Sequence, residues 1–243
     1  MPLMGPDIMG QNTGGSSAAD LDEWITLDYA DVAFEVDTNT IKTSASTTAG
    51  VTSLDINDGV GQTDAIQCWQ MLWNVKDVDG SAVTLYQNAT YSGIEFRILP
   101  SGTLPSGDDT LLTIGLAKGE AVLGNDFFTV GCRWDVAGAP DAFYQHSTSE
   151  GSSSQATTTT GHVVGQCVMF TNGNDLEVPY FNSQWVASIG GSVEKHKGVA
   201  SAVDLGDDSD SANQNRILVC VGGSTGAVDA KLQYRLIPRA GND

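Results

Sequence analysis

The chain has 243 residues, and its 30 acidic residues outnumber its 11 Lys and Arg residues, so the formal net charge at pH 7 is −19. A surface of this sign argues against direct binding to nucleic acid or to anionic membranes, because both require basic patches. Hydrophobic residues make up 40% of the chain and charged residues 17%. This composition is sufficient for a folded core with a Gly-, Ser- and Thr-rich surface.

The first thirty residues predict an N-terminal arm. Residues 1–19 contain four Gly and two Pro without any helical or strand period. Asp20 and Glu23 have the spacing of a capping box, which predicts one short turn before the sandwich begins. We expect the arm either to bind a neighbouring subunit or to fold back on its own domain. The side chains available for partner binding are Met1, Leu3, Met4, Ile8 and Met9.

Strand patterns recur from residue 31 to the end of the chain. Val32, Phe34 and Val36 alternate with polar or small residues, and residues 51–56 form a possible short strand. AIQCWQMLWNV (residues 65–75) is apolar on both faces, which predicts a central strand covered on both sides. A turn is expected at Asp79 and Gly80. Further strands are expected in residues 81–86, 93–99, 109–119, 125–135, 162–170, 216–223 and 229–238, and around Trp185.

Residues 137–161 are poor in apolar side chains and predict a long exposed loop. No helical crossover separates the strand patterns, so the sequence predicts an all-β antiparallel sandwich of the jelly-roll kind. The expected organisation is an arm with a short capping turn over residues 1–30 and a single domain over residues 31–243. The four cysteines, which lie in apolar strand-like segments, are expected to be buried free thiols.

Enzyme motifs are not found, since the chain contains no GxSxG elbow, phosphate-binding loop or HExxH pair. We therefore expect a non-enzymatic protein, with a polysaccharide-active enzyme as an alternative that no motif supports. The segment MPLMGPDIMG lacks the basic and apolar regions of a signal peptide, which predicts synthesis in a cytoplasm without export.

Two further groups of side chains are candidate sites. Asp208, Asp210 and Asn213 offer alternating oxygen ligands for calcium, although the full order of a calcium-binding loop is not met. A solvated acidic loop is the alternative, and no other cofactor is expected. Tyr144, Tyr180 and Trp185 lie near predicted loop ends, where aromatic rings stack on sugars or pack at the edge of a core.

Four segments, FFTVGCRWD, HVVGQCVMFTNGND, RILVCVGG and DAKLQYRLIP, follow one another in a strand rhythm. This rhythm resembles that of concanavalin A-like and laminin G-like jelly-roll sandwiches. Together with the Gly/Ser arm, it is similar to structural proteins of tailed-phage particles. The resemblance implies a bacteriophage virion protein, acting as a capsid decoration or tail appendage through contacts with copies of itself and other virion proteins. It carries over no site residue. A carbohydrate-binding module that recognises host surface glycans is the alternative.

Overall fold

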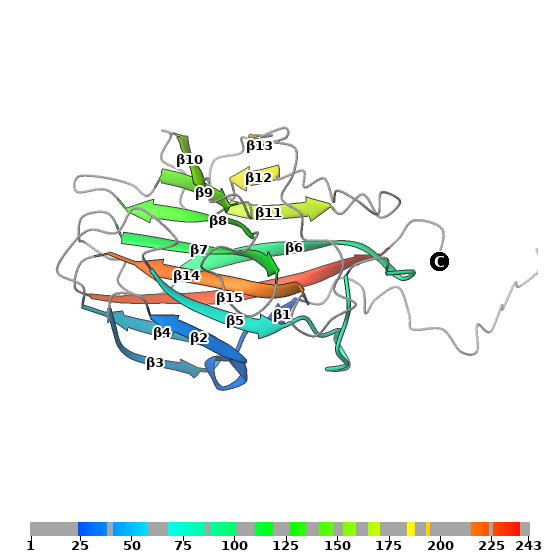
Figure 1. Cartoon of the computed structure of the whole chain (residues 1–243), viewed down its shortest axis with the longest axis horizontal. Helices are drawn as coiled ribbons and strands as arrows, with labels where there is room; N and C mark the ends of the chain where they lie inside the picture. The colour runs from blue at the N-terminus through cyan, green and yellow to red at the C-terminus, as the bar shows by residue number, and fades with distance from the viewer. Residues whose placement is uncertain are drawn as a thin grey trace, which may run out of the picture.

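The computed structural model describes thirteen segments of the chain. These are residues 24–37, 41–57, 68–85, 88–100, 110–118, 127–134, 141–147, 153–158, 165–170, 184–187, 193–194, 215–223 and 226–238. The described residues form two antiparallel sheets that face each other (Figure 1).

Sheet A has the strand order β13-β12-β11-β6-β15-β4-β3, and β1 pairs separately with β15. Its strands are β1 (Ile25–Thr26), β3 (Lys42–Thr48), β4 (Val51–Ile56), β6 (Tyr91–Pro100), β11 (Gly165–Phe170), β12 (Gln184–Ala187), β13 (Val193–Glu194) and β15 (Gly226–Pro238).

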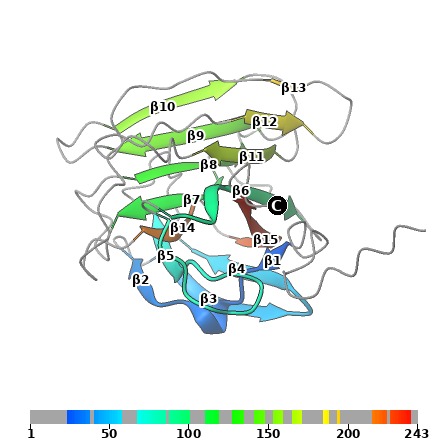
Figure 2. The same ribbon diagram turned by 90° about the vertical axis from the view of Figure 1, so that its right-hand side faces the viewer.

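Sheet B has the order β10-β9-β8-β7-β14-β5-β2. Its strands are β2 (Phe34–Asp37), β5 (Trp69–Asn74), β7 (Thr110–Lys118), β8 (Phe127–Trp134), β9 (Asp141–Ser147), β10 (Ser153–Thr158) and β14 (Asn215–Gly222). Both views place β2 and β3 at one end of the sandwich and β10 and β13 at the other (Figure 2).

The order of the central strands is that of a jelly roll. Sheet A contains the run β4-β15-β6-β11 and sheet B the run β5-β14-β7-β8. The chain crosses between the sheets from β4 to β5, from β5 to β6 and from β6 to β7, so these four consecutive strands alternate between the two sheets. Two sheets connected in this way are the double-sheet jelly roll. The predicted antiparallel sandwich is therefore confirmed.

The main core lies between the sheets and takes every second residue of each central strand. From sheet B it takes Trp69, Met71 and Trp73, and from sheet A it takes Phe96 and Tyr234, all of them buried. Alternation along a strand directs the intervening residues to the outer face. The core residues are spaced by two along each strand. This is why the alternation of apolar residues in the sequence located most of these strands.

Strand β5 is buried on both faces, as the sequence predicted. Leu72, which alternates with the core tryptophans, belongs to a second buried cluster with residues of β7, β8 and β14. The strand is not at the centre of sheet B, however, since only β2 lies beyond it. The second cluster consists of Cys68, Leu72, Leu111, Ala117, Phe127, Leu218 and Cys220, and both cysteines are buried thiols, as expected.

Two further sequence predictions were wrong. The expected loop at 137–161 contains β9 and β10, which pair with each other, and β9 also pairs with β8. Neither β9 (DAFYQHS) nor the Ser- and Thr-rich β10 (SSQATT) has an apolar alternation, so only backbone pairing defines them as strands. The expected strand at 81–86 is reduced to a single bridge between Lys76 and Ala82. The turn before it is confirmed at Gly80, which has a φ of +80°.

The hairpin of β3 and β4 has a two-residue loop, Ala49 and Gly50, with φ values of 51° and 75°. Both positive values identify the type I′ turn, whose twist matches that of the flanking strands. The sequence located β4 correctly but not β3, whose seven residues contain no large apolar side chain.

Replacing Ala49 with Asn should stabilise the protein by about 0.5–1 kcal/mol, because Asn tolerates the left-handed region better than Ala does. Chemical denaturation measures the change. Thr48→Asn, at the neighbouring exposed position of β3, is the matched control and should bring no gain. A neutral or destabilising Ala49→Asn would contradict the turn assignment.

Candidate functional site

The described chain begins on the outer face of sheet A, where six side chains form what we call the Trp24 cluster: Trp24, Thr26, Glu95, Arg97, Gln233 and Arg235. Strand β1 places Thr26 opposite Gln233 of β15. Gln233 is in turn opposite Arg97 of β6. The cluster therefore joins β1 to β6, about 70 positions later in the sequence, and β6 to β15, about 140 positions later again. Cross-strand pairing in the antiparallel sheet brings these side chains together.

Gln233 connects the three strands by hydrogen bonds. Its Oε1 accepts from Nε of Arg97 at 2.7 Å, and its Nε2 donates to Oγ1 of Thr26 at 2.8 Å. The Gln233 residue is only 8% exposed. A buried side-chain amide without hydrogen-bond partners would lower the stability of the fold. Because both the oxygen and the nitrogen of this amide are hydrogen-bonded, the observed register of β1 is favoured.

Beside this amide, Arg235 forms an ion pair with Glu95 through its Nε. The Glu95 side chain is 4% exposed and that of Arg235 is 27% exposed. The indole ring of Trp24 lies over both guanidinium groups, with its centroid 3.9 Å from Cζ of Arg97 and 4.9 Å from Cζ of Arg235. Cation–π attraction of this kind stabilises by about 0.5–2 kcal/mol.

The cluster carries two guanidinium groups and one carboxylate, so it is locally positive in a strongly acidic chain. Burial and the nearby charge of Arg235 lower the pKa of Arg97, while Glu95 opposes that shift. Trp24 covers this positive surface. The arrangement fixes the backbone at Trp24 against the outside of the sandwich, and it contains no nucleophile paired with a base.

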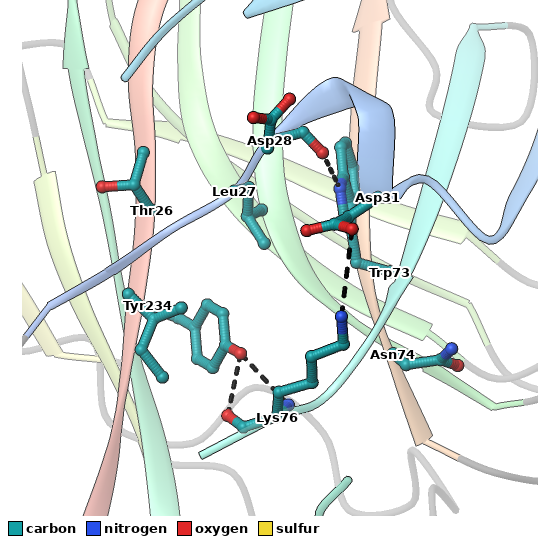
Figure 3. A pocket seen from close by; sticks show the side chains of 9 residues that line it. Thr26, Leu27, Asp28, Asp31, Trp73, Asn74, Lys76 and Tyr234 are labelled. Atoms are coloured by element: carbon teal, nitrogen blue, oxygen red, sulfur yellow. Dashed lines mark hydrogen bonds and ion pairs between the residues drawn. The ribbon is translucent and has the colours of Figure 1, made fainter. Parts of the chain in front are cut away.

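A small pocket lies between the segment that leads from β1 to η2 and the end of β5 (Figure 3). The hydroxyl of Tyr234 donates to the carbonyl of Lys76 at 2.8 Å and accepts from its N–H at 3.1 Å. Nε1 of Trp73 donates to the carbonyl of Asp28 at 2.7 Å. The residues that line the pocket are Ile25, Thr26, Leu27, Asp28, Asp31, Trp73, Asn74, Lys76 and Tyr234.

The volume of this pocket is about 40 Å³, which suits a water molecule rather than an organic substrate. Asp31 contributes an ion pair with Lys76 at 3.9 Å. These contacts hold the 3-10 turn η2 (Tyr29–Asp31) against β5, and Asp28 caps the turn by accepting from the N–H of Ala30. The pocket is thus part of the scaffold. The predicted cap residues Asp20 and Glu23 lie outside the described segments.

Lys42 closes the side of the sandwich between β3 and β2. Its Nζ donates to the hydroxyl of Tyr29 at 2.5 Å and pairs with Glu35. It also lies 5.2 Å from the ring centroids of both Tyr29 and Trp69. Burial alone lowers the pKa of Lys42, but the hydrogen bonds to Glu35 and Tyr29 outweigh it and raise the pKa overall.

The structure describes the strand positions of two of the three predicted glycan contacts. Tyr144 lies in β9 of sheet B, opposite Val130 and Ala156. Trp185 lies in β12 of sheet A, opposite Cys167 and Glu194. Tyr180 is outside the described residues. So are the candidate calcium ligands Asp208, Asp210 and Asn213, and the arm residues Met1, Leu3, Met4, Ile8 and Met9.

Among the described residues, no group of three or more His, Cys, Asp or Glu side chains could hold a metal ion. No helix within the described segments is long and apolar enough to cross a membrane. The residues of the Trp24 cluster were missed as a site by the sequence analysis. The alternation of side chains along each strand placed Glu95 and Arg97 on one face of β6, and Gln233 and Arg235 on one face of β15. The sequence did not indicate that these two strands pair.

Comparison with known proteins identifies no family. No family model matches the chain, and no curated protein matches it. A solved structure of a functionally unknown protein from Saccharomyces cerevisiae aligns with a TM-score of 0.48 and 7% sequence identity, over 88% of this chain and 100% of that one.

Tyr234→Phe should destabilise the protein at pH 7 by about 1–3 kcal/mol, because the N–H and C=O of Lys76 lose their shared partner. Burial raises the pKa of Tyr234 from 10.0 to about 12. The unfolded chain therefore loses this proton first, and the contribution of the hydroxyl should decline between about pH 10 and 12. Urea unfolding of both proteins at several pH values measures the difference, and a constant difference across that window would contradict the assignment.

Arg235→Ala should cost about 3 kcal/mol or more, because it leaves the buried carboxylate of Glu95 without its partner. Adding Glu95→Gln to this variant should recover part of the loss, since the second change removes the buried charge. Lys231→Ala is the control, because Lys231 is an exposed residue of the same strand. Thermal unfolding measures all three, and equal effects of Arg235→Ala and Lys231→Ala would contradict the structural importance of the pair.

Proposed function

We propose that this protein is a non-enzymatic structural component of a virus particle, a capsid decoration or tail appendage that acts through contacts between subunits. Its partners are further copies of the chain and other particle proteins, and the place of action is the assembled particle after synthesis in a host cytoplasm.

The Trp24 cluster is the observation that carries this proposal. The cluster attaches the backbone to the outside of sheet A by the register of β1, the two bonds of Gln233 and the ring of Trp24 over two guanidinium groups. A segment that merely trails from a domain needs no such attachment. An assembly segment benefits from it, because a fixed point of exit lowers the conformational entropy that the segment loses when it binds a neighbouring subunit.

The sequence before Trp24 has the composition of an assembly segment. Its Gly and Ser residues impose no fold, while its Met, Leu and Ile side chains offer apolar contacts that adapt to an irregular groove. At about 25 cal/mol per Å² of buried apolar surface, a few such contacts supply several kcal/mol. Jelly rolls also serve as capsid domains, but the fold hosts many functions, so it is secondary support.

Deleting residues 1–19 should leave the sandwich folded and remove higher-order assembly, because the deletion spares β1 and the Trp24 cluster. Circular dichroism checks the fold, and light scattering with electron microscopy of the native assembly measures the second effect. A full-length variant with Ser at positions 1, 3, 4, 8 and 9, produced with an added initiator Met, separates the apolar contacts from the length of the segment. Unchanged assembly of both variants, or unfolding of the truncated protein, would contradict the proposal.

A further inference from the structure

The segment that follows β5 forms a short hairpin over residues 75–83, which we call the Val78 hairpin. A bridge between Lys76 and Ala82 joins its two arms. All the residues from 78 to 82 are exposed. The hairpin therefore presents its tip, rather than its arms, to a partner.

Four hydrogen bonds hold this tip in one conformation. Oδ1 of Asp77 accepts from the N–H of Asp79 at 3.1 Å and from the N–H of Ser81 at 2.8 Å. The backbone N–H of Asp77 donates to the carbonyl of Ser81 at 2.9 Å, and its carbonyl accepts from the N–H of Gly80 at 3.0 Å. Gly80 has a φ of +80°, which Gly adopts without strain. A Cβ atom at Gly80 would meet nothing within 4 Å, so open space lies beside this rigid turn.

The base of the hairpin is fixed to the core of the sandwich. The hydroxyl of Tyr234 bonds both the N–H and the C=O of Lys76 (Figure 3). Val75 is buried, and Val83 packs against the main core. The ammonium group of Lys76 pairs with Asp31 of η2. A contact made at the tip is thus connected through a short, rigid arm to the folded domain.

Val78 is the apolar part of the tip. It is 45% exposed, and among the residues that the structure describes it is the only large apolar one in so open a position. A single exposed apolar residue is ordinary on a protein surface, but this one lies between two carboxylates on a preorganised turn. Burial and then the charges of Asp77 and Asp79 raise the pKa of Tyr91, which indicates a negative potential around the tip.

We propose that the Val78 hairpin docks on a basic particle protein, with the side chain of Val78 in a small apolar pocket that Lys or Arg side chains surround. An apolar centre with a polar rim is the usual composition of a protein interface. The preorganised tip lowers the entropy that binding costs. A second copy is disfavoured as this partner, because the acidic tip and a net charge of −19 have the same sign. This inference rests on the proposed function, since it gives the chemistry of another particle protein.

The experiment places a photo-crosslinking amino acid in the full-length chain within the native particle. At position 78 it should cross-link to a Lys- or Arg-rich peptide of a different particle protein, which mass spectrometry identifies. At position 84, an exposed residue just outside the hairpin, the yield should be much lower. A cross-link from position 78 to another copy of this chain, or equal yields at the two positions, would overturn the proposal.

Rebinding of the purified protein to particles that lack it measures what each side chain contributes. Val78→Ser should weaken rebinding about tenfold at an unchanged melting temperature, because it removes an apolar contact that is buried only in the complex. Asp79→Asn should weaken rebinding and reduce its dependence on salt, because it removes one charge that faces the basic rim. Asp229→Asn, the same change on β15, is the control. Equal effects of the two Asp variants would refute the contact.

Gly80→Val tests the preorganisation, because a φ of +80° strains a β-branched residue although the space beside Gly80 admits its side chain. It should weaken rebinding while Val78 and both carboxylates remain, and Gly80→Asn should retain more of the binding because Asn tolerates this conformation. If the wild-type protein and the tip variants rebind equally well, the tip contact is wrong and the proposed function stands. If the wild-type protein does not rebind to the particles, both are wrong.

Discussion

The structure depends on β15, because this strand is the neighbour of three others. Its first half pairs with β4, its second half with β6, and β1 pairs at Gln233 and Tyr234. The two faces of the strand have different tasks. Tyr234 faces the core and fixes the backbone of Lys76 through its hydroxyl, while Gln233 and Arg235 face outward and fix the start of the described chain. A shift of one residue would exchange these faces, so the register of β15 determines both attachments.

Buried polar groups confirm how strongly this register is specified. Glu95 and Gln233 are buried on the outer face of sheet A and each has a polar partner on the neighbouring strand. In any slipped register the carboxylate of Glu95 would lose Arg235, and an unpaired buried charge costs more than the apolar contacts of one strand position supply. Specificity of pairing therefore comes from the polar face, while most of the stability comes from the apolar core.

The sequence predicted the fold well where side chains alternate and poorly where only backbone pairing defines a strand. The patterns of β6 and β15 are apolar at every second position over most of their length, so their existence and faces were evident. Strands β3 and β10 consist largely of Ser, Thr, Ala and Gln, and β9 has its two large aromatic residues side by side. No local alternation separates such strands from loops. The Trp24 cluster could not be predicted for a related reason. It joins residues from β1, β6 and β15, and which of these strands pair depends on the strand order of the jelly roll.

Three cations of the described segments lie at contacts between distant segments. Lys42 joins η2 and β2 to β3, Arg235 joins β15 to β6, and Arg216 of β14 contacts the ring of Phe34 of β2 at 4.5 Å. A cation used in this way neutralises a local excess of acid and packs its aliphatic part against an aromatic ring. Because surfaces of like charge cannot supply complementary ion pairs, the contacts between copies that we propose must depend on uncharged groups.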